Sequence, residues 1–211
     1  MEGGRRRIAP LISEFTARYP GISAELILTD KGLDVVEEEM DVALHVTPPP
    51  SSNIVSRVVL TTCRIVCASP EYAAAHNVIK RPVDLLDHDC IRLVRRPGQI
   101  YDEWPFKENG RVTHVRVGGS LTTSSGEVMH DWALAGRAVA RKLLWDVEED
   151  VKAGRLIRFL EPHECDEVKL HLTYPSRSYL PPRVRLFIDF IVSSLQTPEE
   201  KGGCLKPAKR C

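Results

Sequence analysis

The stretch IAPLISEFTARYPGISAELIL at residues 8–28 decides the expected fold of this chain of 211 residues. Its first part has apolar residues at helical spacing, and Pro20-Gly21 ends that pattern. The apolar run Ala24–Leu28 that follows is typical of a strand. Residues 33–40 then predict a short acidic helix, and residues 41–46 predict a second strand. Strand, helix and strand in this order predict an α/β protein with parallel pairing.

The remaining segments continue this alternation. Residues 54–69 are β-rich and are expected to bend or turn near Thr61. Residues 197–211 have no hydrophobic period and are expected to form a disordered tail. We therefore expect an α/β fold that can divide into two lobes. The further helices are expected at 70–76, from Ser124 or Ser125 to Gly136, at 145–153 and at 181–195, and the further strands at 90–93, 114–117, 137–144, 156–160 and 168–174.

Composition excludes several classes of protein. The 29 basic and 29 acidic residues leave no net charge, which argues against a chain that mainly coats nucleic acid. A hydrophobic content of 43% is typical of a globular core. The longest uncharged stretch, residues 42–56, is interrupted by three prolines, so no membrane span is expected. The N-terminus has no long apolar centre of a secretory signal, and we expect a cytoplasmic protein.

Enzyme and metal signatures are missing from the sequence. It contains no glycine-rich phosphate loop, nucleophile elbow or zinc-protease helix, so we expect no enzyme activity, catalytic residue or cofactor. Cys63 and Cys67 would lie about 13 Å apart on a strand, which is too far for a shared metal ion. An enzyme that uses Cys90 with His88 stays a competing hypothesis, although adjacent residues rarely point at one atom.

A cluster of hydroxyl side chains at residues 122–125 precedes a predicted helix. Such hydroxyls satisfy the free N–H groups at a helix start, which is the simplest interpretation. The same N–H groups and the helix dipole can also hold a carboxylate, and strand-to-helix loops are where ligands bind in open α/β sheets. Arg137 follows Gly136 and has two interpretations, a cation at the helix C-terminus or a contact for an acidic ligand.

Taken together, these segments resemble the effector-binding domain of LysR-type transcriptional regulators over nearly all of residues 5–196. No single motif decides the resemblance, but the order and spacing of the motifs are specific. The matching stretches are 8–15 with 19–21, 35–46, 67–72, 82–85 with 88–91, 104–106, 135–140, 144–147, 153–156 and 183–191.

The resemblance implies a fold similar to the type 2 periplasmic binding proteins, in which two α/β lobes hold a small effector in the cleft between them. On this chain the two crossover strands would lie near residues 64–69 and 170–174. Lobe one would then contain residues 1–66 and 174–196, and lobe two residues 67–173.

In the family, effector binding changes how the domains pack in a homodimer or homotetramer, and this alters promoter binding by a winged helix-turn-helix domain. The implied partners are therefore a small-molecule effector, with a weak preference for a carboxylate, and DNA bound only through that other domain. Carried over by position, the expected effector contacts are Thr29, Thr47, Thr123, Ser124, Ser125 and Arg137.

Two family features are missing from this sequence. One is the winged helix-turn-helix domain, and the other is the first strand of lobe one, before Ile8. We expect the loss of that strand to leave backbone groups of its neighbours unpaired. The alternative functions are a free-standing solute-binding protein of the same fold and a truncated subunit that pairs with intact regulators as a dominant-negative partner.

Overall fold

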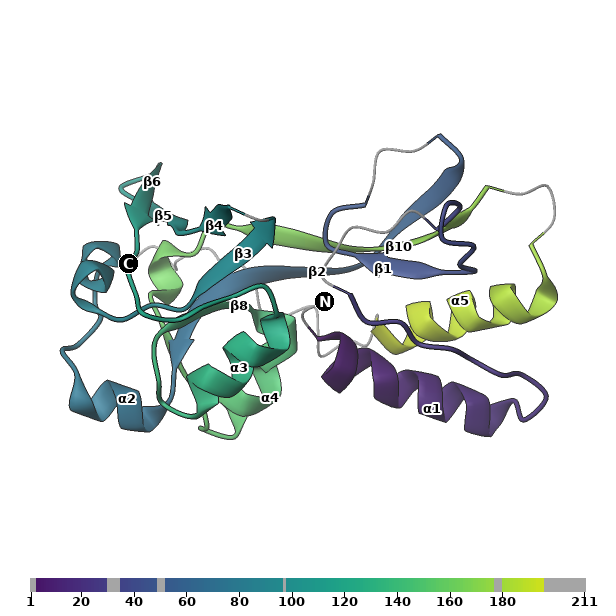
Figure 1. The fold of residues 1–211 in the computed structure, drawn as a ribbon, viewed down its shortest axis with the longest axis horizontal. Coiled ribbons are helices and arrows are strands. Elements are labelled where there is room, and N and C mark those ends of the chain that lie inside the picture. The colour runs from purple at the N-terminus through teal and green to yellow at the C-terminus, as the bar shows by residue number, and fades with distance from the viewer. Residues whose placement is uncertain (1–2, 30–34, 49–51, 97, 177–179, 196–211) are drawn as a thin grey trace, which may run out of the picture. The chain divides into compact units, whose positions relative to one another are not determined.

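Residues 3–29, 35–48, 52–96, 98–176 and 180–195 are described by the structure, which is a computed structural model. The chain divides into two compact units, which Figure 1 shows as ribbons. The central unit contains Cys63–Glu167, and the flanking unit contains residues 4–62 and the described residues from Val168 onward. The predicted lobe boundaries lie a few residues beyond these division points. The predicted tail at 197–211 lies outside the described residues.

The flanking unit is built on two packed helices. A short π-helix, η1 (Gly4–Ile8), leads into α1 (Ala9–Arg18), and α5 (Pro182–Leu195) lies beside α1 (Figure 1). Phe15 is buried, with ring centroids 5.1 Å from Phe187 and 5.4 Å from Phe190. The helices predicted from the apolar spacing at 8–19 and 181–195 are confirmed, and the ring of Phe15 joins them.

The strand predicted at 41–46 pairs in the opposite sense to the prediction. β1 (Ala43–His45) lies within the predicted strand at 41–46, and it pairs with β10 (Glu167–Pro175) in an antiparallel manner. β10 is also the neighbour of β2 (Ile54–Ala68). β2 is a single strand of 15 residues that contributes to both units, so the turn considered near Thr61 is wrong.

The strand predicted at Ala24–Leu28 is wrong. Residues 22–29 have no regular secondary structure, and the side chains of Leu26, Ile27 and Leu28 are 37%, 55% and 43% exposed. A strand forms only when a neighbour takes up its backbone hydrogen bonds, and no described strand pairs with this run. The helix predicted at 33–40 is also wrong over 35–39, which form a turn, while 33 and 34 lie outside the described residues.

The core of the central unit lies between β-strands and two helices. The end of β2 pairs in an antiparallel manner with β8 (Ala140–Leu143) and β9 (Ile157–Phe159). Against them pack α3 (Gly126–Leu134) and α4 (Leu144–Lys152). The predicted helices and strands of this region are confirmed. The fully buried members of this core include Ile65, Cys67, Ile91, Met129 and Val147.

A smaller set of strands completes the central unit. β3 (Arg92–Arg96) lies between β4 (Gln99–Tyr101) and β7 (Thr122–Thr123), and β5 (Glu103–Glu108) forms a hairpin with β6 (Arg111–Arg116). The β3–β7 pair is parallel, so parallel pairing occurs in this unit. Short helical segments are α2 (Pro70–Ala75), η2 (Pro82–Asp87) and η3 (Glu161–His163). No helix among the described residues is long and apolar enough to span a bilayer.

The packing of α1 on α5 leads to a stability prediction. Phe15 is 1% exposed, and replacing it with alanine removes its ring contacts and leaves a cavity. We expect Phe15→Ala to lower the free energy of unfolding by about 3–5 kcal/mol in urea denaturation. Ile27→Ala is the matched control, because the exposed side chain of Ile27 predicts a change within about 0.5 kcal/mol. A large loss for Ile27→Ala would show that residues 24–28 are packed after all.

Candidate functional site

The hydroxyl loop, Thr122–Ser125, consists of β7 and the two residues that lead from it into α3 in the central unit. β7 runs parallel to β3, with Thr122 opposite Arg92 and Thr123 opposite Leu93. The loop therefore leaves the carboxyl end of a parallel strand and enters a helix N-terminus. In open α/β sheets this is the position where small ligands bind.

Two of the loop hydroxyls hold its backbone. Ser125 is the N-cap residue of α3, and its Oγ accepts a hydrogen bond from Val128 N at 3.4 Å. Thr123 Oγ1 accepts a hydrogen bond from Ser125 N at 3.0 Å. The capping interpretation is thereby confirmed for Ser125. Each of these hydroxyls still has its own O–H to donate.

Ser124 lies between them and is exposed. Its hydroxyl makes no hydrogen bond to the part of the chain that the structure describes. It lies immediately before the free N–H groups at the start of α3, where the positive end of the helix dipole attracts anions. The loop can therefore offer hydroxyl and amide donors to one small anion.

Arg137 is not brought to the hydroxyl loop. α3 has 9 residues, so its two ends are about 13 Å apart, and Arg137 lies beyond the C-terminal end. There the N–H of Arg137 donates to Trp132 O at 3.0 Å and that of Gly136 to Ala133 O at 3.2 Å. Gly136 has φ of 66°, which glycine adopts readily at a helix end. The exposed Arg137 side chain is placed to complement the helix C-terminus.

The other two predicted contacts belong to the flanking unit. Thr29 is half-buried and follows the extended residues 22–28, and Thr47 is exposed at a bend just after β1. The structure thus gathers Thr123, Ser124 and Ser125 in one loop.

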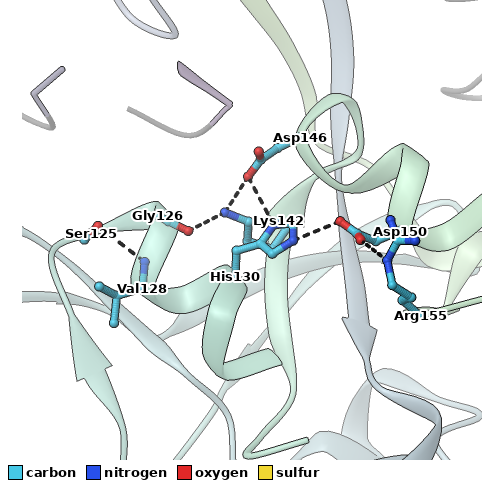
Figure 2. A network of polar contacts seen from close by, with 8 residues as sticks. All are labelled: Ser125, Gly126, Val128, His130, Lys142, Asp146, Asp150 and Arg155. Carbon is cyan, nitrogen blue, oxygen red and sulfur yellow. Dashed lines mark hydrogen bonds and ion pairs between the residues drawn. The ribbon is translucent and has the colours of Figure 1, made fainter. Parts of the chain in front are cut away.

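A buried polar network lies under the start of α3 (Figure 2). Lys142 of β8 has no exposed surface, and its Nζ donates to Gly126 O at 2.7 Å. The same nitrogen lies 2.7 Å from Asp146 Oδ2 on α4. On α3, His130 is also fully buried, and its Nε2 lies 2.9 Å from Asp150 Oδ2. The network ends at Arg155, whose Nε donates to Asp150 Oδ1 at 2.6 Å.

Asp146 is the centre of this network. Its Oδ2 contacts the Lys142 ammonium, and His130 Nδ1 lies 3.8 Å away. Lys142 and Asp146 form a buried salt bridge, and the His130 ring lies between Asp146 and Asp150. Burial alone would raise the pKa of Asp146, but His130 and Lys142 outweigh it and lower the pKa to about 2. Asp146 is therefore ionised at neutral pH.

Sequence reasoning did not find this network. Its signals were a lysine inside an apolar strand segment and aspartates four residues apart at 146 and 150. A lysine among buried strand residues needs an anionic partner, and Asp146 lies four residues further along the chain. His130 carried no local signal of its own, because it meets Asp150 only through packing of α3 on α4.

The competing cysteine and metal hypotheses gain no geometric support. Burial raises the pKa of the Cys90 thiol to about 12, the opposite of what a thiolate nucleophile needs. His88 Nδ1 lies 3.3 Å from the hydroxyl of Tyr72. Among the described residues, no three metal-ligating side chains gather in one place.

The sequence profile of one family, described as the LysR substrate binding domain, matches residues 2–196. The chain belongs to this family. One relative is the HTH-type transcriptional regulator DmlR of Escherichia coli strain K12, which is 28% identical over 188 residues. Another is the HTH-type transcriptional regulator CrgA of Neisseria meningitidis, which is 28% identical over 189 residues. Each alignment covers 89% of this chain, but only 61% of DmlR and 62% of CrgA.

Solved structures of LysR regulatory domains show the same fold. The regulatory domain of CrgA from Neisseria meningitidis has a TM-score of 0.83 at 26% identity and covers 92% of this chain and 95% of its own. That of AphB from Vibrio vulnificus has a TM-score of 0.73 at 25% identity and covers 90% and 93%. This LysR substrate-binding domain therefore has the expected two-lobed fold that resembles periplasmic binding proteins.

The capping contact of Ser125 leads to a second stability prediction. Ser125→Ala removes the acceptor for Val128 N, so we expect the free energy of unfolding to fall by about 1 kcal/mol. Ser124→Ala removes an exposed hydroxyl and should change it by less than about 0.5 kcal/mol. Chemical denaturation of both variants beside the wild type measures the difference. Equal losses for the two variants would contradict the assignment of Ser125 as the cap.

The lowered pKa of Asp146 predicts a specific acid sensitivity. The ordinary pKa is 3.8 and the folded value is about 2, so the unfolded chain binds a proton first as the pH falls. The contribution of this carboxylate is complete above about pH 5 and is lost as the pH falls to about 2, with a total on the order of 2 kcal/mol.

The measurement is the free energy of unfolding from urea titrations between pH 5 and pH 2, for the wild type and Asp146→Asn. The variant is expected to be less stable at pH 5, because Lys142 loses its buried counter-charge, and to have a flatter profile below it. Parallel profiles for the two proteins would show that Asp146 does not carry this acid dependence.

Proposed function

We propose that this LysR substrate-binding domain senses a small anionic effector, for which a carboxylate is the first candidate, and that the hydroxyl loop contacts it. The observation that carries the proposal is the position of Ser124 and Ser125 at the N-terminus of α3, directly after a parallel strand. Backbone N–H groups and hydroxyls that converge there suit a carboxylate, which accepts several hydrogen bonds at once.

Each loop residue has a distinct proposed role. The exposed Ser124 hydroxyl donates to the ligand. Thr123 and Ser125 hold the loop backbone through their oxygens and can donate their own O–H. Thr29, Thr47 and Arg137 enter the proposal as further contacts through the family resemblance alone.

In the whole protein, we propose that the effector shifts a population of homodimers or homotetramers between arrangements with different promoter affinity. The chain spans about three fifths of the length of DmlR and CrgA, both of which are named as HTH-type regulators. Their names support the proposal that DNA is bound by a helix-turn-helix domain outside this chain. We propose that the whole protein acts in the cytoplasm. The size of the shift is limited by the difference in effector affinity between the two arrangements.

The other functions are less well supported. A free-standing solute-binding protein or an enzyme would be expected to resemble proteins of those classes. The relatives described above are transcriptional regulators, and the structural matches are their regulatory domains.

A ligand screen tests the proposed function. The purified chain is heated with succinate, malonate, citrate, benzoate or sulfate, and the melting temperature is recorded. At a ligand concentration about 100 times Kd, binding adds about 2.7 kcal/mol, so we expect an increase of several degrees for at least one carboxylate.

The variant Ser124→Ala should reduce that increase, and Ser13→Ala, an exposed serine on α1, should leave it unchanged. An equal increase in Ser124→Ala would remove the loop from the binding site. No increase with any of the five anions would contradict a small carboxylate or sulfate effector.

A further inference from the structure

The strongest unexplained feature of the central unit is a lysine that has no solvent exposure. Moving an ammonium out of water costs several kcal/mol, and protein interiors hold lysines only where anions and carbonyl oxygens surround the charge. Lys142 Nζ has both, at 2.7 Å from Asp146 Oδ2 and 2.7 Å from Gly126 O. A pair of apolar side chains of the same size would fill this space at no electrostatic cost. Stability alone therefore does not account for the pair.

Gly126 gives the pair its place in the site. It is the first residue of α3, is itself buried and directly follows Ser125 of the hydroxyl loop. The Lys142 ammonium thus fixes, from the interior, the turn whose N–H groups face the proposed effector. Figure 2 shows Lys142 between this turn on one side and Asp146 on the other.

The rest of the network holds the ammonium in place. Asp146 and His130 come from different helices, α4 and α3, and His130 joins Asp146 to Asp150. Arg155 neutralises Asp150 at the outer end of the network. The positive charges of Lys142 and Arg155 therefore balance the two aspartates. The network couples the start of α3 to α4 through charge and not through apolar packing alone.

We propose that Lys142, held by Asp146, is a positioning residue for the hydroxyl loop. It keeps the first turn of α3 in the orientation that binds an anionic ligand, without touching the ligand itself. The inference rests on the proposed function of this loop as an effector contact.

The first test measures local order and needs no ligand. In the double variant Lys142→Met/Asp146→Leu, an apolar pair replaces the buried ions, so we expect an equal or higher melting temperature. Amide hydrogen exchange at residues 126–130 should nevertheless become at least about tenfold faster, with exchange in α5 unchanged. Unchanged exchange at 126–130 would overturn the positioning role, whether or not the domain binds any ligand.

The control is a second Lys–acid pair with the same spacing. Glu148 and Lys152 on α4 lie 2.9 Å apart, but the lysine is 64% exposed. Lys152→Met/Glu148→Leu should leave exchange at residues 126–130 unchanged. An equal acceleration in this control would also overturn the proposal, because the effect would then not be specific to the buried pair.

A neutral donor separates hydrogen bonding from packing. Lys142→Gln/Asp146→Asn removes both charges but keeps an N–H donor on the side chain at position 142. We expect this variant to retain slow exchange at 126–130. If the apolar double variant does not fold, Lys142→Gln/Asp146→Asn is compared with the single change Lys142→Met. This comparison decides whether a donor at position 142 orders the turn. Fast exchange at 126–130 in both of these variants would overturn the proposal.

The final measurement connects order to binding. Calorimetric titration with succinate and with sulfate should show affinity at least about tenfold lower in Lys142→Met/Asp146→Leu than in the wild type. Faster exchange with unchanged affinity would overturn the role in ligand binding. If the wild type binds neither anion, the proposed function fails for these two ligands, and the exchange data still judge the positioning role.

Discussion

A lysine ammonium buried under a helix start constrains the central unit more than any other single group. The charge at Lys142 can exist there only while Asp146 stays ionised and the Gly126 carbonyl stays within reach. These two requirements tie together the end of β8, the beginning of α4 and the first turn of α3. The lowered pKa of Asp146 shows that the balance favours the ionised pair in spite of its burial.

The flanking unit shows the opposite case, in which hydrophobicity is not enough to make an element. Residues 24–28 have the composition of a strand, yet their apolar side chains are largely exposed. Composition predicts how well a residue fits a sheet, whereas a strand also needs a neighbour for its backbone groups.

Local chemistry made most of the remaining fold predictable. The start of α3 was marked by Ser125, and the helices predicted from Ser124 or Ser125 to Gly136, at 145–153 and at 181–195 lie within two residues of their observed bounds. The hydroxyl loop was also identified from sequence, since a cap and an anion site use the same residue types. The separation of Arg137 from that loop follows from the length of the helix between them. This helix length could already be read from the sequence.

The buried network could not be predicted in the same way. Its members come from α3, β8, α4 and the turn after α4, and only their packing brings His130 to Asp150. Within a short window the two aspartates and Arg155 resembled ordinary surface charges, and only Lys142 lay in an apolar segment. The pattern became informative only when Lys142 was placed on a strand whose residues are all buried.

The chain that leaves α3 is held closely against the start of α2. A side chain at Gly136 would meet Ser69 Oγ at 3.0 Å, and Ser69 is the residue that caps α2. A larger residue at Gly136 would therefore disturb the cap of α2 as well as the end of α3, so these two helix ends depend on one small residue.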